Sequence, residues 1–426
     1  MTPELKGFLL VSTLKLLVVF TITMLGVAYM TLMERKVSAW MQNRLGPNRV
    51  GPGGFFQPIA DGIKNLLKEE TLPRSANLVL FFLAPCMSFI PALCVGAVIP
   101  WAAPLPLTFD FTLPVLGRFT HAGLVPMAVA DVPVGFLFVL AISSLGVYGV
   151  TLAGWSSNSK YSLLGGLRAA AQMISYEVAM GMSLVPVLLL TGNVSFSSVV
   201  GSQQQGLWFA LPLMVSAFIF LVAGLAETNR APFDLPEAES ELVAGYHTEY
   251  SAFKFSMFFI AEYANVLTFA AMFATLFLGG WDIPFTHWDE SPGLLQTIAT
   301  GLVMAIKSTS LIFFVMWIRW TLPRFRYDQL MSLGWKFMLP LALFYIVAIA
   351  TLLVVLQWLG FAQGSWPFHL GLAMLNIVAV IVLFMILDRG RVISPASSRL
   401  DQEAITRLRA VAGSRHAPSL LPETGD

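Results

Sequence analysis

The sequence predicts an all-α polytopic membrane protein, and three observations lead to that prediction. Of the 426 residues, 57% are hydrophobic and only 12% are charged, whereas soluble domains carry about 25% charged residues. The apolar residues gather in runs of about 20, the length at which a helix crosses roughly 30 Å of hydrocarbon. Most charged residues fall in the links between these runs. This composition excludes an ordinary soluble domain.

About nine runs are long enough to be transmembrane helices. They lie near residues 7–33, 78–101, 130–153, 164–191, 207–226, 251–279, 295–319, 337–360 and 366–388. We expect residues 1–388 to form a single membrane domain with an added interfacial amphipathic helix and short cytoplasmic helices. Residues 389–426 are expected to form a polar cytoplasmic tail. The first run lacks a small-residue cleavage site, so we expect a retained span rather than a signal peptide.

The links between the runs differ sharply in basic residues. Links 34–77, 154–163, 227–250 and 320–336, together with the tail, hold eighteen Lys and Arg residues, whereas the opposite links hold only Arg118. Cytoplasmic links retain positive charge. We therefore expect the N-terminus on the outer, periplasmic side and the C-terminus in the cytoplasm.

Two further features of composition exclude whole classes of function. The net charge of +1 and the lack of a basic stripe exclude nucleic acid as a partner. Cys86 and Cys94 share one apolar run and give neither a disulfide framework nor a metal-ligand spacing. We expect no redox centre, no metal site and no catalytic residue in this chain. The histidines show no ligand spacing and are expected to be non-catalytic.

The first cytoplasmic link opens with Glu34-Arg35-Lys36 and continues through the Gly- and Pro-rich stretch 44–54, which predicts a shaped loop. Residues 55–70 follow the pattern of an interfacial amphipathic helix. The apolar face holds Phe56, Ile59, Ile63, Leu66 and Leu67, and the polar face holds Asp61, Lys64, Lys68 and Glu69. Such a helix either anchors the loop on the membrane or lines a lipid-side entrance for an amphiphilic substrate.

Charged residues also lie inside the apolar runs. Glu177, Glu262 and Lys307 are well inside their spans, and Lys15 lies near the outer end of its span, from which it can reach the interface. Burial in hydrocarbon disfavours charged side chains, so the three inner residues need partners from other helices. We expect a protonatable relay, with a structural ion pair as the alternative.

The link 227–241 is strongly acidic. Its acids are Glu227, Asp234, Glu237, Glu239 and Glu241. Arg230 lies three residues after Glu227 and can pair with it on one helical turn, while Pro232 and Pro236 interrupt the helix. One arginine does not neutralise this cluster, so we expect at least one carboxylate to be protonated easily and the titrations to be coupled. A solvated loop face is the alternative.

The last cytoplasmic turn, Arg319 to Gln329, is both cationic and aromatic. Three interpretations stay open for it. The arginines can pair with acids of the same chain, dock a subunit outside the membrane, or simply anchor the link on the cytoplasmic side.

Several motifs together resemble one family, the quinone-site membrane subunit of proton-pumping NADH:quinone oxidoreductase, respiratory complex I, known in bacteria as the H subunit. The motifs are Glu34-Arg-Lys, Arg44-x-Gly-Pro-Asn-x-x-Gly-Pro, Trp155-Ser-Ser-Asn-Ser-Lys-Tyr, Arg168-Ala-Ala-Ala-Gln-Met-Ile-Ser-Tyr-Glu177, Glu227-Thr-Asn-Arg-x-Pro-Phe-Asp-Leu-x-Glu-x-Glu-Ser-Glu-Leu and Leu322-Pro-Arg-Phe-Arg-Tyr-Asp-Gln-Leu. They cover the four cytoplasmic links and most spans from residue 29 to about residue 340.

The resemblance implies a subunit that binds ubiquinone or menaquinone where it contacts peripheral subunits and that couples quinone reduction to proton translocation. Quinone would be the substrate, and the FMN and iron–sulfur clusters would lie in partner subunits. Those partners would be peripheral iron–sulfur and quinone-site subunits and the antiporter-like membrane arm. The ninth span and the charged tail suit a bacterial form, which implies a bacterial inner membrane.

The resemblance also implies roles for individual residues. Quinone binding would involve Glu34, Arg35, Arg44, Asp61, Lys64, Glu69 and Phe233. Proton coupling would involve Glu177, Glu227, Arg230, Asp234, Glu237, Glu239, Glu241, Glu249, Glu262 and Lys307.

Two other functions remain alternatives. One is the related membrane subunit of a membrane-bound hydrogenase or of a deazaflavin-dependent dehydrogenase. The Glu34-Arg-Lys motif and the Arg-Tyr-Asp-Gln turn favour the NADH-quinone branch over this alternative. The other is a stand-alone ion transporter. No internal repeat is evident in the chain, and many secondary transporters are built from such repeats.

Overall fold

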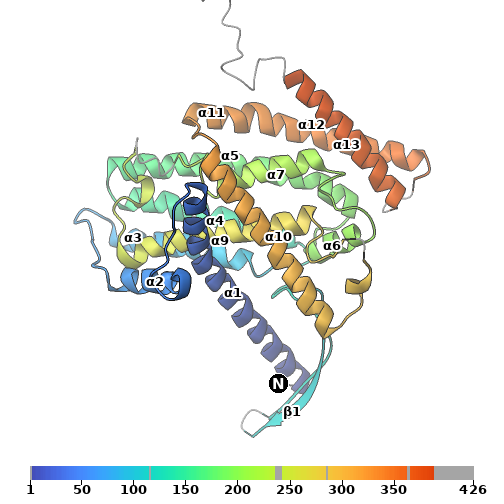
Figure 1. The fold of residues 1–426 in the computed structure, drawn as a ribbon, viewed down its shortest axis with the longest axis horizontal. Coiled ribbons are helices and arrows are strands. Elements are labelled where there is room, and N and C mark those ends of the chain that lie inside the picture. Colours follow the sequence, from blue (N-terminus) through green and yellow to red (C-terminus); the bar gives the residue numbers. More distant parts are fainter. Residues whose placement is uncertain (1, 115–116, 236–241, 285, 362–364, 388–426) are drawn as a thin grey trace, which may run out of the picture. The chain divides into compact units, whose positions relative to one another are not determined.

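The computed structural model describes residues 2–114, 117–235, 242–284, 286–361 and 365–387, which are mostly helical (Figure 1). Seven helical stretches among them are long and apolar enough to cross a membrane. They are α1 (Pro3–Met41), α3 (Leu78–Val95), α4 (Gly135–Ser156), α5 (Lys160–Thr191), α9 (Ala252–Phe277), α10 (Leu294–Thr321) and the continuous stretch Tyr327–Trp358. The predicted all-α polytopic membrane fold is confirmed.

Two further apolar helices, α7 (Met214–Glu227) and α13 (Trp366–Leu387), occupy the remaining expected spans. How many of these helices cross the bilayer stays a prediction. The chain divides into two compact units, Met1–Ala373 and Met374–Asp426. The second unit is described only to Leu387, the end of α13, so the expected polar tail lies outside the described residues.

The stretch Tyr327–Trp358 consists of α11 (Tyr327–Ser332), the π-helical turn η4 (Leu333–Met338) and α12 (Leu339–Trp358). The other helical elements are short: η1 (Pro52–Gly54), α2 (Gln57–Leu67), α6 (Phe196–Gln204), η2 (Gly245–His247) and η3 (Trp288–Glu290). The helix α2 matches the expected amphipathic helix within 55–70, and no residue of α2 is fully buried.

Two helix ends differ from those expected. Helix α1 continues to Met41, so Glu34-Arg35-Lys36 lies within a helix and does not open a loop. No Gly or Pro interrupts residues 34–41, and the first such pair is Gly46-Pro47. Helix α7 begins at Met214 rather than near residue 207, because Pro212 has no N–H and disfavours helical geometry in the residue before it.

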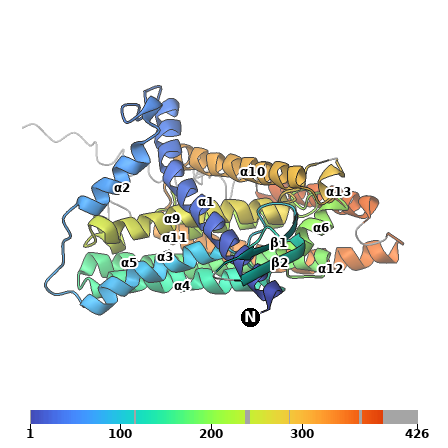
Figure 2. The same cartoon turned by 90° about the horizontal axis from the view of Figure 1, so that it is seen from below.

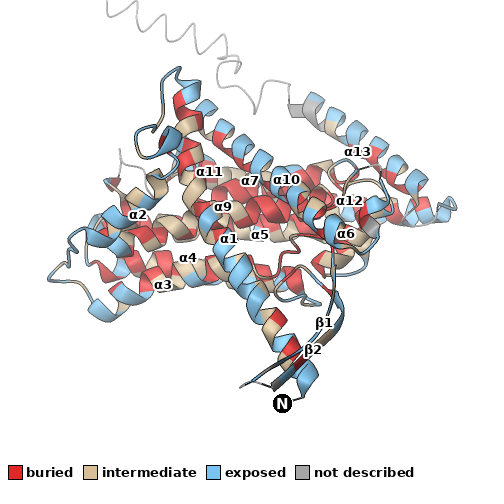
Figure 3. Cartoon of the chain, turned by 60° about the horizontal axis from the view of Figure 1, so that its bottom comes forward, coloured by how far each residue is buried: buried red, intermediate tan, exposed pale blue. Residues whose placement is uncertain are grey.

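The bundle of residues 1–373 is built around α5 and α9, the most buried of the long helices, while α1 is the least buried (Figure 3). Helix α5 packs against α4, α7 and α12, and α3 packs against α4 and α9 (Figure 2). Small residues allow these close contacts. A Cβ added to Gly149 of α4 would lie 2.3 Å from Ser88 Oγ of α3, so a larger side chain there would separate the two helices.

One antiparallel hairpin of β1 (Leu105–Leu113) and β2 (Gly117–Val125) is an element that we did not expect. Phe111 lies opposite Phe119, with ring centroids 5.5 Å apart. The alternation of apolar and polar residues in 105–113 is the sequence signal for such a strand. Helix α1 crosses β2 at Gly7, where a Cβ would lie 2.0 Å from the Thr120 carbonyl oxygen. We call this side of the bundle the hairpin end.

The opposite side of the bundle we call the charged end. It holds the C-terminal ends of α1 and α10 and the N-terminal part of α9. Glu34 of α1 forms an ion pair there with Arg319 of α10. Helix α2 joins this end through Arg35 of α1, whose guanidinium lies 2.6 Å from the Asp61 carboxylate. Both α1 and α10 therefore run from the hairpin end to the charged end.

Candidate functional site

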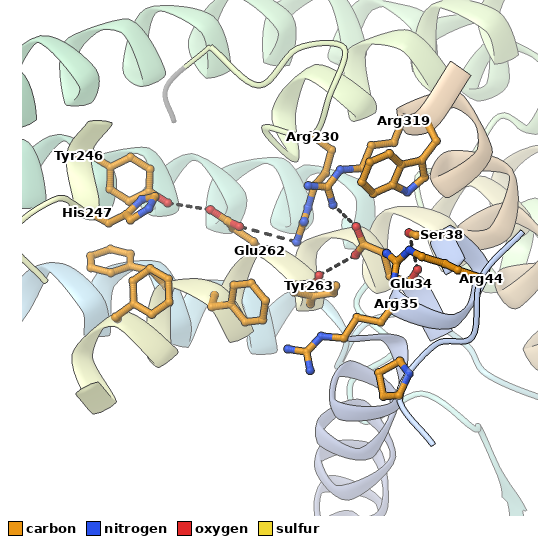
Figure 4. Close-up of a pocket in the computed structure, with 15 residues that line it drawn as sticks. Glu34, Arg35, Ser38, Arg44, Arg230, Tyr246, His247, Glu262, Tyr263 and Arg319 are labelled. Atoms are coloured by element: carbon orange, nitrogen blue, oxygen red, sulfur yellow. Dashed lines mark hydrogen bonds and ion pairs between the residues drawn. The ribbon is translucent and has the colours of Figure 1, made fainter. Parts of the chain in front are cut away.

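A cavity of about 530 Å³ opens at the charged end (Figure 4). Helix α1 contributes Glu34, Arg35 and Ser38 to its wall, and the turn after α1 contributes Arg44. Helix α9 contributes three phenylalanines, Glu262 and Tyr263, and the remaining wall comes from the turn after α7, from η2 and from the end of α10. The cavity thus combines charged groups with aromatic surface, as ligand sites commonly do.

Glu34 stands at one end of a polar network in this cavity. Its residue is only 9% exposed. One carboxylate oxygen accepts from the Arg319 guanidinium, and the other accepts the Tyr263 hydroxyl at 2.6 Å. Charge-assisted hydrogen bonds of this kind are about twice as strong as neutral ones. The carboxylate is therefore held in place by partners from two other helices.

Glu262 occupies the other end of the network. It accepts the Tyr246 hydroxyl at 2.8 Å and lies 3.7 Å from the Arg230 guanidinium. The same guanidinium lies 4.1 Å from the centre of the Tyr263 ring. Arg230 thus connects Glu262 to Tyr263 and through it to Glu34 (Figure 4). Glu262 thus has a partner from outside its own helix, as expected, and that partner is Arg230, for which the sequence had suggested only Glu227.

The turn that carries Arg230 is held by Gln172 of α5, which is fully buried. Its Nε2 donates to the carbonyl oxygens of Ala226 and Phe233, both at 2.8 Å. These carbonyls mark the two ends of the turn. One amide group therefore fixes the position of Arg230 relative to α5.

Asp234 follows this turn and lies 3.5 Å from the Arg324 guanidinium in the link between α10 and α11. Burial raises the pKa of Asp234 to about 6, and the Arg324 charge partly opposes that shift. Phe233 stacks on Phe325 with ring centroids 5.5 Å apart. The expected pairing of the last cationic turn with acids of the same chain is thus present.

A second cavity of about 260 Å³ lies between α1, α2 and α9. Its wall is mostly apolar and includes Val27, Leu66 and Ile260. It shares Arg35 and Phe259 with the first cavity, so the two spaces adjoin. This arrangement places an apolar space beside a polar one.

Glu177 and Glu227 lie away from both cavities. Glu177 of α5 accepts the Ser144 hydroxyl of α4. Glu227, at the end of α7, is close enough to Glu177 for their charges to interact. These two expected proton-coupling residues therefore form a separate pair of carboxylates within the bundle.

Lys307 of α10 lies near the hairpin end, twelve residues before Arg319, which corresponds to about 18 Å of helix. Its ammonium donates to the carbonyl oxygens of Leu278, Gly280 and Asp282 at 2.7–2.9 Å. It therefore satisfies backbone carbonyls of the turn that follows α9. Lys15 plays a similar part in α1, where it donates to the carbonyls of Pro126 and Ala128.

The structure brings some of the expected site residues together and separates others. Lys64 and Glu69 are exposed, Glu249 is half-buried, and none of the three lines either cavity. The acids Glu237, Glu239 and Glu241 lie outside the described residues. The expected quinone-binding and proton-coupling roles of all these residues stay predictions.

The sequence reasoning missed several residues of the cavity. They are Ser38, Tyr246, His247, Tyr263 and Trp320. The position of Tyr263 directly after Glu262 was the only local signal, whereas Tyr246 reaches Glu262 through the fold alone. Among the described residues, no group of three or more His, Cys, Asp or Glu side chains is placed to hold a metal ion.

Known proteins of similar sequence place the chain in a family. A sequence model of the family described as NADH dehydrogenase matches residues 14–350. The chain is 48% identical to the H subunit, number 2, of NADH-quinone oxidoreductase from Koribacter versatilis over 347 residues, which cover 80% of this chain and 97% of that protein. It is 49% identical to the H subunit of NADH-quinone oxidoreductase from Paramagnetospirillum magneticum over 358 residues, 84% of this chain and 96% of the relative.

A third relative extends the comparison beyond bacterial names. NADH-ubiquinone oxidoreductase chain 1 of Chondrus crispus is 47% identical over 352 residues, 83% of this chain and 99% of that protein. The matched family model and these relatives agree with the resemblance found in the motifs. The chain belongs to the NADH dehydrogenase family, and it is a membrane subunit, of the H type, of the enzyme complex NADH-quinone oxidoreductase, complex I.

Proposed function

We propose that this chain forms the membrane side of a quinone chamber and couples quinone reduction to proton translocation. The observation that carries the proposal is the network Tyr246–Glu262–Arg230–Tyr263–Glu34 in a cavity that adjoins an apolar one. The polar cavity receives the quinone head group, and the apolar cavity admits its tail from the lipid.

The chemistry of a quinone fits this division. Its tail partitions into apolar surroundings, while its two carbonyl oxygens need donors. Arg35, Arg44 and Tyr263 line or face the polar cavity and are donors of that kind. Reduction adds two electrons and two protons to the head group. In this proposal the electrons come from iron–sulfur clusters in peripheral partner subunits, and this chain supplies groups that bind the quinone and exchange protons.

Proton coupling uses the carboxylates of the network. A negative charge that develops on the quinone attracts Arg230 and Arg319, which weakens their hold on Glu262 and Glu34 and favours protonation of these acids. Glu177 and Glu227 continue the acidic route into the bundle, and Glu237, Glu239 and Glu241 belong to the same acidic link. Each elementary charge moved against the membrane potential stores about 2.3 kcal/mol per 100 mV.

The same proposal places the molecule in its membrane. The charged end faces the cytoplasm and the peripheral subunits, and the hairpin end faces the periplasm of a bacterium. The excess of basic residues in the links of the charged end supports this orientation. The antiporter-like membrane arm is a further partner in the membrane.

The variant Glu262→Gln tests the function directly. In the purified complex it should abolish or strongly reduce NADH-dependent quinone reduction, while NADH oxidation by an artificial acceptor at the peripheral subunits continues. Asp110→Asn, which removes an exposed ion pair with Arg118 on the hairpin, is the control and should leave both activities unchanged. Normal quinone reduction and proton uptake in Glu262→Gln would refute the proposal.

A further inference from the structure

The link between α2 and α3 is fastened to the start of α9 by two adjacent contacts. The Thr71 backbone N–H and its hydroxyl both donate to Ser251 Oγ, at 2.8 and 2.9 Å. The Glu70 carboxylate lies 3.1 Å from the Lys254 ammonium. Residues that are some 180 positions apart in the sequence thus hold this link in place.

Lys254 is an unusual partner, because its side chain is only 6% exposed while that of Glu70 is 44% exposed. The ammonium lies 4.4 Å from the centre of the Phe82 ring and 5.3 Å from that of Phe81, both in α3. A buried ammonium is stable only where opposite charge and aromatic faces replace its water. The ion pair therefore joins α3, α9 and the link after α2 at one point.

This point lies at the edge of the apolar cavity. Phe253 and Ser256, on either side of Lys254, line one wall of the cavity, and Asn65 and Leu66 of α2 line the facing wall. Helix α2 has no fully buried residue of its own. It is held by the ion pair Arg35–Asp61 in its middle and by the contacts of Glu70 and Thr71 beyond its end.

We propose that Glu70, Thr71, Ser251 and Lys254 form a latch that sets the width of the 260 Å³ cavity and so determines how an apolar tail passes through it. The proposal rests on the quinone function proposed above. Glu70 and Lys254 are positioning residues, since neither lines the cavity. Opening the latch lets α2 move away from α9, which impairs binding of a tail but not of a head group.

The test uses Glu70→Gln in the intact complex and two quinones with the same head group. One carries a single isoprene unit, and the other carries a decyl tail. We expect the KM for the decyl quinone to rise about fivefold, the upper range for loss of a partly exposed ion pair. The KM for the short quinone and kcat for both should stay unchanged.

Asp110→Asn is a matched control, because Asp110 is also the half-exposed acid of an ion pair, with a side chain 52% exposed. It should leave both KM values as they are. The conservative variant Glu70→Asp keeps the carboxylate and should retain most of the selectivity. If Glu70→Gln fails to assemble, Thr71→Val removes the hydroxyl contact with Ser251 and should shift the KM ratio in the same direction by less.

Equal changes in KM for both quinones, or no change in either KM, would refute the proposal that these residues set the width of the cavity. That result differs from failure of the proposed function. If Glu262→Gln abolishes quinone reduction while Glu70→Gln leaves the KM ratio alone, only the latch is refuted. If Glu262→Gln reduces quinone normally, the quinone chamber itself is refuted.

Discussion

Arg230 at the charged end is buried and Lys307, midway along α10 toward the hairpin end, is half-buried, and the partners of these two cations differ. Arg230 lies against the Glu262 carboxylate and the Tyr263 ring beside a cavity of about 530 Å³. Lys307 donates directly to three backbone carbonyls, while the Asp282 and Asp289 carboxylates are only close enough for their charges to interact with it. A carbonyl is a fixed dipole that neither gains nor loses a proton at neutral pH. The comparison teaches that the group in direct contact with a charge matters: Arg230 touches a carboxylate, whereas Lys307 touches carbonyls.

The largest loss of quinone reduction is expected when the polar network at the charged end is disrupted. Arg230→Met leaves Glu262 buried without this cation, and removal of one partner of a buried ion pair costs about 3–5 kcal/mol. We expect quinone reduction per assembled complex to fall by at least about 100-fold, which corresponds to roughly 3 kcal/mol. Enzyme assays normalised to FMN content provide the measurement. Turnover close to that of the unmodified complex would show that the charged network is structural.

Replacing Gln172 is expected to lower quinone turnover by a smaller factor. Gln203 provides the matched control, because both glutamines are fully buried. Gln172 fixes the turn of Arg230, whereas Gln203 donates to the Thr275 carbonyl and accepts from the backbone N–H groups of Phe209 and Gly279 near the hairpin end.

Gln172→Met should lower quinone turnover about tenfold, the effect expected for a displaced charge worth roughly 1.4 kcal/mol. Gln203→Met should lower the melting temperature of the complex without changing its turnover. Parallel turnover assays and thermal unfolding of the two variants separate these outcomes. Equal losses of turnover in both variants would contradict a special role for Gln172.

The pH dependence of the charged end gives a third comparison. Because burial raises the pKa of Asp234 from 3.8 to about 6, the folded protein keeps this proton to a higher pH than the unfolded chain does. Ionisation thus destabilises the folded state progressively as pH rises through the window from about 4 to 6. Asp234→Asn should remove this contribution, so the melting temperature of the complex should fall less between pH 4 and pH 6 in the variant than in the unmodified protein. An unchanged fall in the variant assigns the titration to another group.

The smallest effect on turnover is expected at the hairpin end. Lys307→Met leaves three carbonyls without their donor, and unsatisfied buried acceptors cost about 1–3 kcal/mol each. We expect less assembled complex and a lower melting temperature, but turnover per complex within about twofold of normal. The opposite pattern, normal assembly with quinone reduction uncoupled from proton transport, would support the proton-coupling role expected from the sequence.

The helices were predictable from the sequence, because apolar runs of spanning length have few alternatives in a membrane. Glu262 was also predictable as a site residue, because a charged group inside an apolar run needs a partner, and Glu34 and Arg230 were predictable from the family motifs in which they lie. Their tyrosine partners were not, because Tyr246 has no local signature, Tyr263 has only its place after Glu262, and both meet these acids through packing of distant segments. The carbonyl acceptors of Lys307 were not predictable either, because the sequence does not indicate which backbone carbonyls a lysine reaches in the fold. The hairpin, in contrast, had a signal in the sequence, because apolar and polar residues alternate in 105–113. The long apolar runs on either side made this strand pattern hard to recognise.

The contact of Gly7 with the Thr120 carbonyl has a mechanical consequence. Helix α1 has 39 residues and is about 58 Å long, well beyond the roughly 30 Å of a hydrocarbon core. A rod of that length must tilt or protrude, and its tilt follows the thickness of the surrounding lipid. Gly7 packs against β2 near one end of α1, and Glu34 lies near the other end. A thinner or thicker bilayer that changes the tilt of α1 therefore shifts Glu34 relative to its partners in the charged network.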